Sequence, residues 1–354
     1  MRLGDFDYQL PPGLIAQHPP ERRGDSRLMV LDRNAASWAH RSFLNLAEYL
    51  NPGDVLVVND TRVLPARLIG RKESGGKVEV LLVRKKGGAG EERHSQEWEC
   101  LAQGSGRLRD RTRVFFEEAV EGELRRRTPD GLWRLSLSGR KGEDLDRSLR
   151  RIGFAPLPPY IHRNGDGAMR ADDRERYQTV YARRDGAIAA PTAGLHFTEK
   201  ILEEIRGKGA QVASLTLHVG MGTFLPVKSE EVQDHRLEPE YFSLGPGAAD
   251  AINHARKDGR RVLAVGTTVT RALESSVDET GKVYPQDGQT GLFILPGHRF
   301  RAVDALVTNF HLPRSTLLML AAAFAGRELI LSAYAEAVRQ GYRFYSYGDA
   351  MLIL

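Results

Sequence analysis

The chain has little cysteine, few aromatic residues and no long apolar run. Cys100 is its only cysteine, which excludes an intramolecular disulfide, a cysteine-ligated zinc site and a Cys-held iron–sulfur cluster. No stretch approaches the roughly 20 apolar residues that a membrane-spanning helix needs. The N-terminal segment carries early acids and prolines without an apolar core, unlike a signal peptide. We therefore expect a cytoplasmic protein that makes no membrane contact.

Motifs that bind metals or phosphates are missing as well. The ten histidines form no HExxH pattern and no pair four residues apart in a helical context, so we expect no metal site. The chain also lacks the P-loop GxxxxGK[ST], the nucleophile elbow GxSxG and a strand-linked GxGxxG followed by an acid. No such motif therefore identifies a reaction.

What the chain does have is an excess of positive charge. It carries a net charge of +5, with an isoelectric point of about 9.3. This balance favours a polyanionic partner such as nucleic acid, although it also keeps many proteins in solution. Arginines gather at 107–113 and 124–131. These two clusters are either solvated faces of short strands or, taken together, a phosphate-binding surface.

Six apolar, β-branched runs end abruptly in small and polar residues, as buried strands bounded by turns do. The six segments are Val55–Arg62, Ala187–Phe197, Ala213–Phe224, Arg261–Ser275, Ala302–Ser315 and Phe344–Met351. Open α/β sheets bind ligands in the crevice beyond their strand ends. Six such turns predict one composite site, and therefore an enzyme.

The pattern between residues 67 and 151 is different. Runs with period-two alternation, such as Lys77–Val83, Glu97–Gln103 and Leu132–Ser138, are separated by glycine-rich or charged turns. This spacing is typical of antiparallel strands in a small barrel or sandwich. We predict an α/β fold whose main sheet domain is formed by residues 1–66 and 152–354, with an antiparallel β-barrel-like domain inserted at 67–151.

Several helices can be placed by their end signals. Thr198 is suited to cap a helix that ends near Gly209, and a second helix spans 248–257. Thr267 or Thr268 is expected to cap the next helix. Two further helices are predicted at 315–325 and 328–340, each followed by a glycine.

Two of the polar clusters combine histidine with small residues. Thr192 and His196 lie between a buried strand and a helix start, where free backbone N–H groups receive anions. His196 is a candidate acid, base or hydrogen-bond donor, unless it only satisfies a local backbone group. His218 precedes Gly220 and Gly222, a pair that either lets the backbone approach a ligand or forms a plain turn.

Three further clusters hold charged and amide groups. Thr267 lies at a helix start, and the following Arg271 and Glu274 either contact substrate or form an intrahelical ion pair. Asn309 and His311 lie in a short turn between an apolar strand and an apolar helix, where polar groups must be satisfied or functional. Asp60 and Arg62 directly follow a strand. For these last two clusters we favour a functional role.

The same clusters resemble a known family. The matching segments are 59–68, 157–163, 175–182, 189–198, 217–227, 303–326 and 342–353, with the match beginning at Asp5–Arg23 and weakest at 67–151. They are similar to S-adenosylmethionine:tRNA ribosyltransferase-isomerases of the queuosine pathway. The resemblance implies an α/β domain with a barrel-like insertion.

The resemblance also implies a reaction. Such enzymes transfer and isomerise the ribosyl part of S-adenosylmethionine onto 7-aminomethyl-7-deazaguanine at the wobble position of tRNA. The product is epoxyqueuosine, and adenine and methionine are released. S-adenosylmethionine is then a co-substrate, tRNA is the macromolecular partner with the inserted domain as a possible contact, and neither a metal nor an iron–sulfur cluster takes part. We expect a monomer.

On this resemblance we assign hypothetical roles. His196, His218 and His311 supply the acid and base. The substrate-binding groups are Asp60, Arg62, Thr192, Gly220, Gly222, Thr267, Arg271, Glu274 and Asn309. One departure from the family pattern stands at Glu238 and Pro239, where relatives often carry His and Ser. The role of that histidine is therefore absent here or taken by Glu238.

Two alternative functions remain at this point. A tRNA-binding protein without catalysis would share the basic charge, but the intact clusters at 59–62, 191–197 and 309–313 argue against lost activity. An S-adenosylmethionine-dependent tRNA methyltransferase would share both substrates, but it would be expected to show a glycine-rich first turn. The identity of the products separates the three functions.

Overall fold

The computed structural model of the chain describes residues 1–86, 93–128, 131–163, 168–220, 227 and 229–354. The chain divides into two compact units. The larger unit comprises Met1–Arg62, Pro158–Asn164 and Gln178–Leu354, and the smaller one comprises Val63–Leu157 and Gly165–Tyr177. Both ends of the chain therefore build the larger unit.

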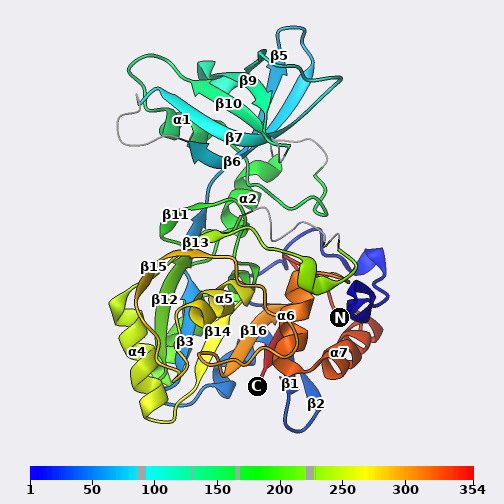
Figure 1. Ribbon diagram of the computed structural model, residues 1–354, viewed down its shortest axis with the longest axis vertical. Coiled ribbons are helices and arrows are strands. Elements are labelled where there is room, and N and C mark those ends of the chain that lie inside the picture. The colour runs from blue at the N-terminus through cyan, green and yellow to red at the C-terminus, as the bar shows by residue number, and fades with distance from the viewer. Residues whose placement is uncertain (87–92, 129–130, 164–167, 221–226, 228) are drawn as a thin grey trace. The chain divides into compact units, whose positions relative to one another are not determined.

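A nine-stranded sheet forms the centre of the larger unit, in the order β15-β13-β12-β3-β14-β16-β17-β1-β2 (Figure 1). The strands are β1 Arg27–Asp32, β2 Ser37–Ser42, β3 Val55–Asn59, β12 Gln211–Leu217, β13 Glu240–Leu244, β14 Val262–Val265, β15 Gln286–Thr290, β16 Ala305–Asn309 and β17 Ala350–Ile353. The central strands β12, β3, β14 and β16 run parallel, and β17 is antiparallel to β16. Every residue of β3, β14 and β16 is buried, as expected for a sheet covered on both faces.

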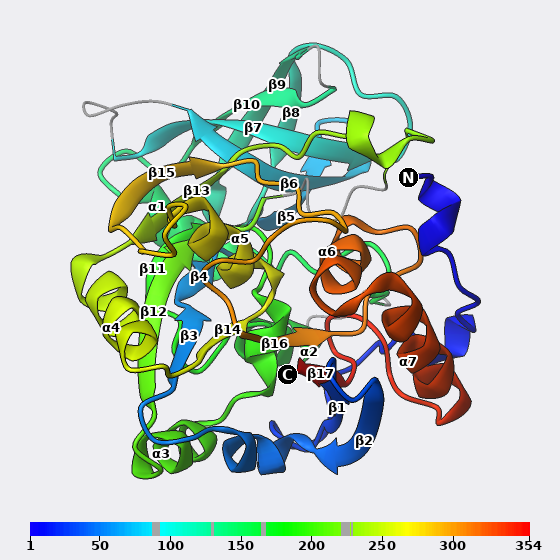
Figure 2. The ribbon, with the colours of Figure 1, turned by 60° about the horizontal axis from the view of Figure 1, so that its bottom comes forward.

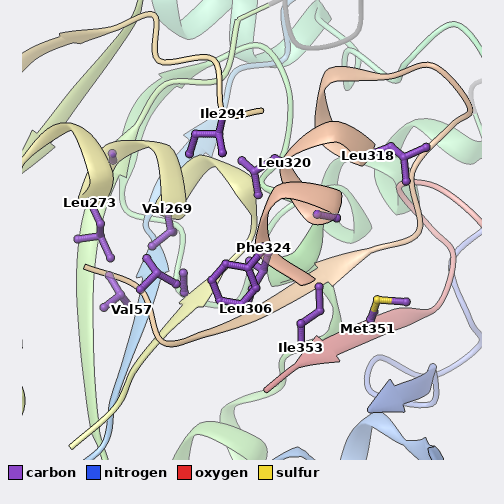
Figure 3. Close-up of a cluster of buried hydrophobic side chains, with 14 of the residues drawn as sticks. Val57, Val269, Leu273, Ile294, Leu306, Leu318, Leu320, Phe324, Met351 and Ile353 are labelled. Carbon is purple, nitrogen blue, oxygen red and sulfur yellow. The ribbon is translucent and has the colours of Figure 1, made fainter. Parts of the chain in front are cut away.

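Helices cover the two faces of this sheet (Figure 2). The helices of the larger unit are α3 Glu199–Gly207, α4 Pro246–Lys257, α5 Thr267–Ser275, α6 Thr316–Ala325 and α7 Arg327–Arg339. Its 3₁₀ turns are η1 Leu3–Phe6, η2 Pro12–Leu14, η3 Phe43–Tyr49, η5 Thr192–His196 and η7 Val232–Asp234. A separate two-stranded sheet is formed by β4 Thr61–Val63 and β11 Arg184–Ala187. Alternate strand residues point to opposite faces. Val57 and Leu306 pack with side chains of α4 to α7 (Figure 3), whereas Leu56 and Val58 pack with α3 and η3.

Two helix caps were predicted from the sequence, and the structure confirms one of them. Thr198 accepts a hydrogen bond from the Ile201 amide at 3.2 Å, so its predicted capping role is confirmed. Ser315 likewise caps α6 through the Leu318 amide. The prediction that Thr267 or Thr268 caps α5 is wrong. Gly266 occupies the cap position with a φ of 91°, because the chain turns directly from β14 into the helix.

In the described part of the chain, no single helix has the length and apolar composition to cross a membrane. The helices α6 and α7 taken together reach that length and composition, and this pair is bent by 115°. Both helices contribute buried side chains to the core beside the sheet.

The smaller unit is built around a closed antiparallel barrel with the strand order β10-β7-β6-β5-β8-β9. Its elements are β5 Arg67–Lys72, β6 Lys77–Lys86, β7 Ser95–Gly104, β8 Thr112–Phe115, β9 Glu121–Arg127, β10 Trp133–Ser138, the 3₁₀ turn η4 Glu117–Ala119 and the helices α1 Leu145–Ile152 and α2 Ala168–Arg176. Alternate residues of β6, namely Val78, Val80 and Leu82, are buried. The predicted fold class, an α/β sheet from both chain ends with an inserted antiparallel barrel, is confirmed.

Candidate functional site

The predicted polar clusters meet at one edge of the large sheet. Because β12, β3, β14 and β16 are parallel and adjacent, their carboxyl ends lie side by side at a spacing of roughly 4.8 Å per strand. Asp60 follows β3, His218 follows β12, Gly266 follows β14, and Asn309 ends β16. This edge is the place where an open α/β sheet binds its ligand.

A small cavity opens at the β14 and β16 part of this edge. It is lined by Ala190, Pro191, Thr192, Ala193, Val219, Gly266, Thr267, Thr268, Thr308, Asn309, His311 and Leu317. Four of these were predicted site residues: Thr192, Thr267, Asn309 and His311. The cavity volume is about 30 Å³, which accommodates one or two water molecules or one small polar group of a ligand. A larger ligand would extend out of the cavity along the sheet edge.

Asn309 carries the clearest sign of a ligand. Its Nδ2 donates to the Tyr345 carbonyl at 3.2 Å and to Nε2 of His196 at 3.0 Å. The carbonyl only accepts, which fixes the amide orientation. The other amide atom, Oδ1, is buried and has no hydrogen-bond partner among the described residues. Such an orphan acceptor is costly unless a ligand or water satisfies it.

His196 is held in one tautomer by these contacts. Since its Nε2 accepts from Asn309, its proton resides on Nδ1, which lies 2.8 Å from the Ser26 hydroxyl. Burial lowers the pKa of His196 to about 3, with a further lowering from the charges of Arg23 and Arg343. His196 is therefore neutral at physiological pH, and both ring nitrogens are occupied. Its geometry suits holding Asn309 in place.

His311 is also neutral, but it faces the cavity. Burial lowers its pKa to about 3. Its Nε2 lies 2.8 Å from the Thr308 hydroxyl, and its backbone N–H donates to the Tyr334 hydroxyl at 3.1 Å. Among the residues that the structure describes, none forms a hydrogen bond to Nδ1 of His311. That nitrogen is available to a ligand.

The β3 and β12 part of the edge holds a second set of polar groups. The Thr216 hydroxyl donates to Oδ1 of Asp60 at 2.6 Å, and Nδ1 of His218 lies 2.8 Å from the Thr61 hydroxyl. Burial lowers the pKa of His218, although Asp60 opposes this shift. His218 is only partly buried, so it is the most accessible of the three candidate histidines.

Arg62 is the exposed residue of β4. Its side chain is about half exposed and donates to the Ala182 carbonyl at 2.7 Å. Asp185 lies 4.0 Å from its Nε. Arg62 is thus accessible at the surface beside the edge, whereas Asp60, two residues earlier, is buried.

Arg271 and Glu274 are both engaged by other parts of the protein. Arg271 forms a buried ion pair with Glu240 and donates from Nε to the Leu292 carbonyl at 2.8 Å. Oε1 of Glu240 also accepts from the Gly220 amide at 2.8 Å. Glu274 accepts from the backbone amides of residues 301–303. The intrahelical ion pair that the spacing suggested is therefore replaced by contacts that hold neighbouring segments.

Two predicted positions add less to this picture. Gly222 lies outside the described residues. Glu238 is exposed on the segment that leads into β13. In the described part of the chain, no three His, Cys, Asp or Glu side chains gather in a way that could hold a metal ion.

Sequence reasoning missed Ser26 and Tyr345. Ser26 lies in none of the six segments and contacts the site through His196. Tyr345 lies in the segment Phe344–Met351, but it contributes only its backbone carbonyl, which the residue type does not reveal. Tyr241, at the start of β13, was also overlooked. An exposed aromatic residue at a strand end was the available signal.

Comparisons with known proteins agree on one family. The model of the family described as queuosine biosynthesis protein matches residues 3–353. A protein of Syntrophotalea carbinolica named S-adenosylmethionine:tRNA ribosyltransferase-isomerase is 52% identical, and one of the same name from Geobacter metallireducens is 51% identical, each over the full length of both chains. A crystal structure of S-adenosylmethionine tRNA ribosyltransferase from Thermotoga maritima is 37% identical with a TM-score of 0.54, covering 99% of this chain and 100% of that one.

Proposed function

The chain belongs to the queuosine biosynthesis protein family, and we propose that it is an S-adenosylmethionine:tRNA ribosyltransferase-isomerase like its relatives. Identity of about 50% over the full length of both chains supports the activity. Asn309 carries the structural support, because its buried amide oxygen, which has no hydrogen-bond partner in the described part of the chain, belongs to a residue that lines the cavity at the sheet edge. We further propose that the enzyme acts as a monomer in the cytoplasm.

The substrate base is proposed to be 7-aminomethyl-7-deazaguanine at the tRNA wobble position. A base removes a C5′ proton, which the adjacent sulfonium acidifies. The ring oxygen then leaves C4′ and becomes the oxygen of an aldehyde at C1′. Adenine departs from C1′ with a proton that an acid supplies. The substrate amine then adds to C4′, and the regenerated C5′ ylide closes a ring on C1′. The resulting alkoxide displaces methionine from C5′. The products are epoxyqueuosine-tRNA, adenine, methionine and one proton.

We place the amino-acid end of S-adenosylmethionine in the cavity. The ammonium group donates to Oδ1 of Asn309, the acceptor that lacks a partner within the described residues. The carboxylate faces the start of α5, where Thr267 and Thr268 line the cavity and where backbone N–H groups favour anions. Thr192 also lines the cavity. This cavity holds only a small group, so the sulfonium and ribose extend along the edge toward β3 and β12.

His218 is the proposed proton-transfer group. It follows β12, two strand spacings or roughly 10 Å from β14, and is accessible where the ribose would lie. The charge of Asp60 opposes the lowering of the His218 pKa by burial, so that His218 can still accept a proton. A positioned base or acid contributes about 10²–10⁴-fold to the rate. His311 serves as a neutral hydrogen-bonding group, and His196 positions Asn309. Arg271 and Glu274 act by holding the segments around the site.

The smaller unit is a proposed contact for the tRNA. Arg111, Arg125 and Arg126 surround a depression on the barrel, together with Asp110 and Glu123. Glu123 pairs with Arg125 at 3.1 Å, so part of the positive charge is compensated. The remaining guanidinium groups are suited to phosphate, which dominates nucleic-acid affinity.

Product analysis tests this function. The protein is mixed with S-adenosylmethionine and an anticodon stem-loop carrying the aminomethyl-deazaguanine, and the small molecules are separated. We expect adenine and methionine in equal amounts, and none with an unmodified stem-loop. S-adenosylhomocysteine would show a methyltransferase instead. RNA binding without turnover would leave a non-catalytic tRNA-binding protein.

A further inference from the structure

An exposed aromatic ring lies at the sheet edge. Tyr241, on β13, is 42% exposed and lies on the strand next to β12. Its ring is stacked on that of His218, with centroids 5.5 Å apart and an interplanar angle of 25°. The tyrosine ring therefore keeps a large exposed area although it is stacked on His218. A flat aromatic surface is therefore presented beside the candidate site.

The stacked pair is held in place from several sides. The His218 amide donates to the Tyr241 carbonyl at 2.9 Å, and the Tyr241 hydroxyl donates to Asp287 at 3.4 Å. Behind the imidazole lies Gly186, where a Cβ atom would stand 2.6 Å from the His218 ring. Only glycine leaves room for the ring there. The platform is thus preorganised, which reduces the entropic cost of stacking a ligand.

Positive charge lies on the same side as the platform. Nη1 of Arg184 is 3.4 Å from the Ser243 hydroxyl, and Ser243 shares a face of β13 with Tyr241 because the two are two residues apart. The charge of Arg184 also lowers the pKa of His218, as a nearby cation does. Arg62, which reaches the Ala182 carbonyl just before this segment, adds a second exposed guanidinium.

We propose that Tyr241, backed by His218, stacks an unpaired base of the RNA substrate while Arg62 and Arg184 contact the adjacent phosphates. Single-stranded RNA is recognised by this combination of aromatic faces and cations. The adenine of S-adenosylmethionine has the same flat ring, but that molecule has no phosphate and is itself positively charged, so the arginines favour RNA. The proposal rests on the proposed function, since it assumes that tRNA is the substrate.

The test compares variants of two exposed tyrosines. Tyr284 is 45% exposed and also bonds an aspartate, Asp278, so Tyr284→Ala is the matched control for Tyr241→Ala. Binding of a fluorescently labelled anticodon stem-loop is followed by anisotropy at constant salt. Stacking contributes about 1–3 kcal/mol per base, so Tyr241→Ala should weaken binding about fivefold to 150-fold. Tyr241→Phe and Tyr284→Ala should bind like the wild type.

Two results would overturn the proposal. One is an RNA affinity of Tyr241→Ala within about twofold of the wild type. The other is a raised KM for S-adenosylmethionine with unchanged RNA affinity, which would show that the ring stacks adenine. Adenine release by the wild-type protein is measured first, so that failure of the proposed function is recognised separately. The melting temperature of each variant confirms that it is folded.

Discussion

Lowering the pH from about 8 to about 5 should destabilise the larger unit by about 4 kcal/mol through His196 and His311. The pKa of each is lowered to about 3 in the folded protein, against about 6.5 in an unfolded chain. Their contribution to stability is complete above pH 6.5 and is lost as the pH falls toward 3, because only the unfolded chain takes up the protons. At pH 5, protonation lowers the free energy of the unfolded state by about 2 kcal/mol per histidine relative to the folded state. This follows because one pKa unit corresponds to about 1.4 kcal/mol.

Urea unfolding followed by tryptophan fluorescence measures this effect. Trp38 is in the larger unit, whereas Trp98 and Trp133 are in the barrel, so replacing the latter two by phenylalanine leaves Trp38 as the reporter. In this background, His196→Gln removes one titrating group and should reduce the pH-dependent loss to about 2 kcal/mol. His254→Gln, at an exposed position on α4, is the matched control. An unchanged loss in His196→Gln would refute the assignment of His196 as a buried, neutral positioning residue.

Other variants test the remaining parts of the site. Asn309→Ala should raise the KM for S-adenosylmethionine about 10-fold to 150-fold, because a hydrogen bond to a charged group is lost. Ser26→Ala should raise this KM less than about tenfold. Equal effects of the two variants would contradict a direct contact between Asn309 and S-adenosylmethionine. Glu240→Gln should cost about 3–5 kcal/mol in urea unfolding because it strands the buried Arg271, and adding Arg271→Met should recover part of it. Arg126→Ala should reduce the slope of log K against log salt for stem-loop binding by about one; an unchanged slope would remove Arg126 from the RNA surface.

Much of the fold could be predicted because burial dictates residue type along the strands. The continuous apolar runs of β3, β14 and β16 are buried on both faces, and the alternating run of β6 has one face inside a barrel. Local signals also sufficed where partners are near in sequence, as for Thr198 and the Ile201 amide. The start of α5 was mispredicted because the positive φ of Gly266 is imposed by the turn from β14, and not by capping chemistry.

The sequence could predict which strand ends meet, but not the contacts that each side chain makes. Parallel strands bring their ends together, so Thr192, Asn309 and His311 meet in one cavity. What each side chain does depends on partners far away in sequence. Arg271 faces Glu240, 31 positions away, and no local pattern distinguishes this pairing from one with Glu274. Likewise, His196 contacts Ser26, 170 positions away, and no local pattern predicts this contact.

Transfer of an isotopic label tests the central claim most directly. S-adenosylmethionine carrying ¹³C in every ribosyl carbon is incubated with the protein and the modified stem-loop, and the RNA is analysed by mass spectrometry. The account predicts that all five labelled carbons appear on the deazaguanine while unlabelled adenine and methionine are released in equal amounts. RNA that gains a methyl group, or no mass at all, would contradict it.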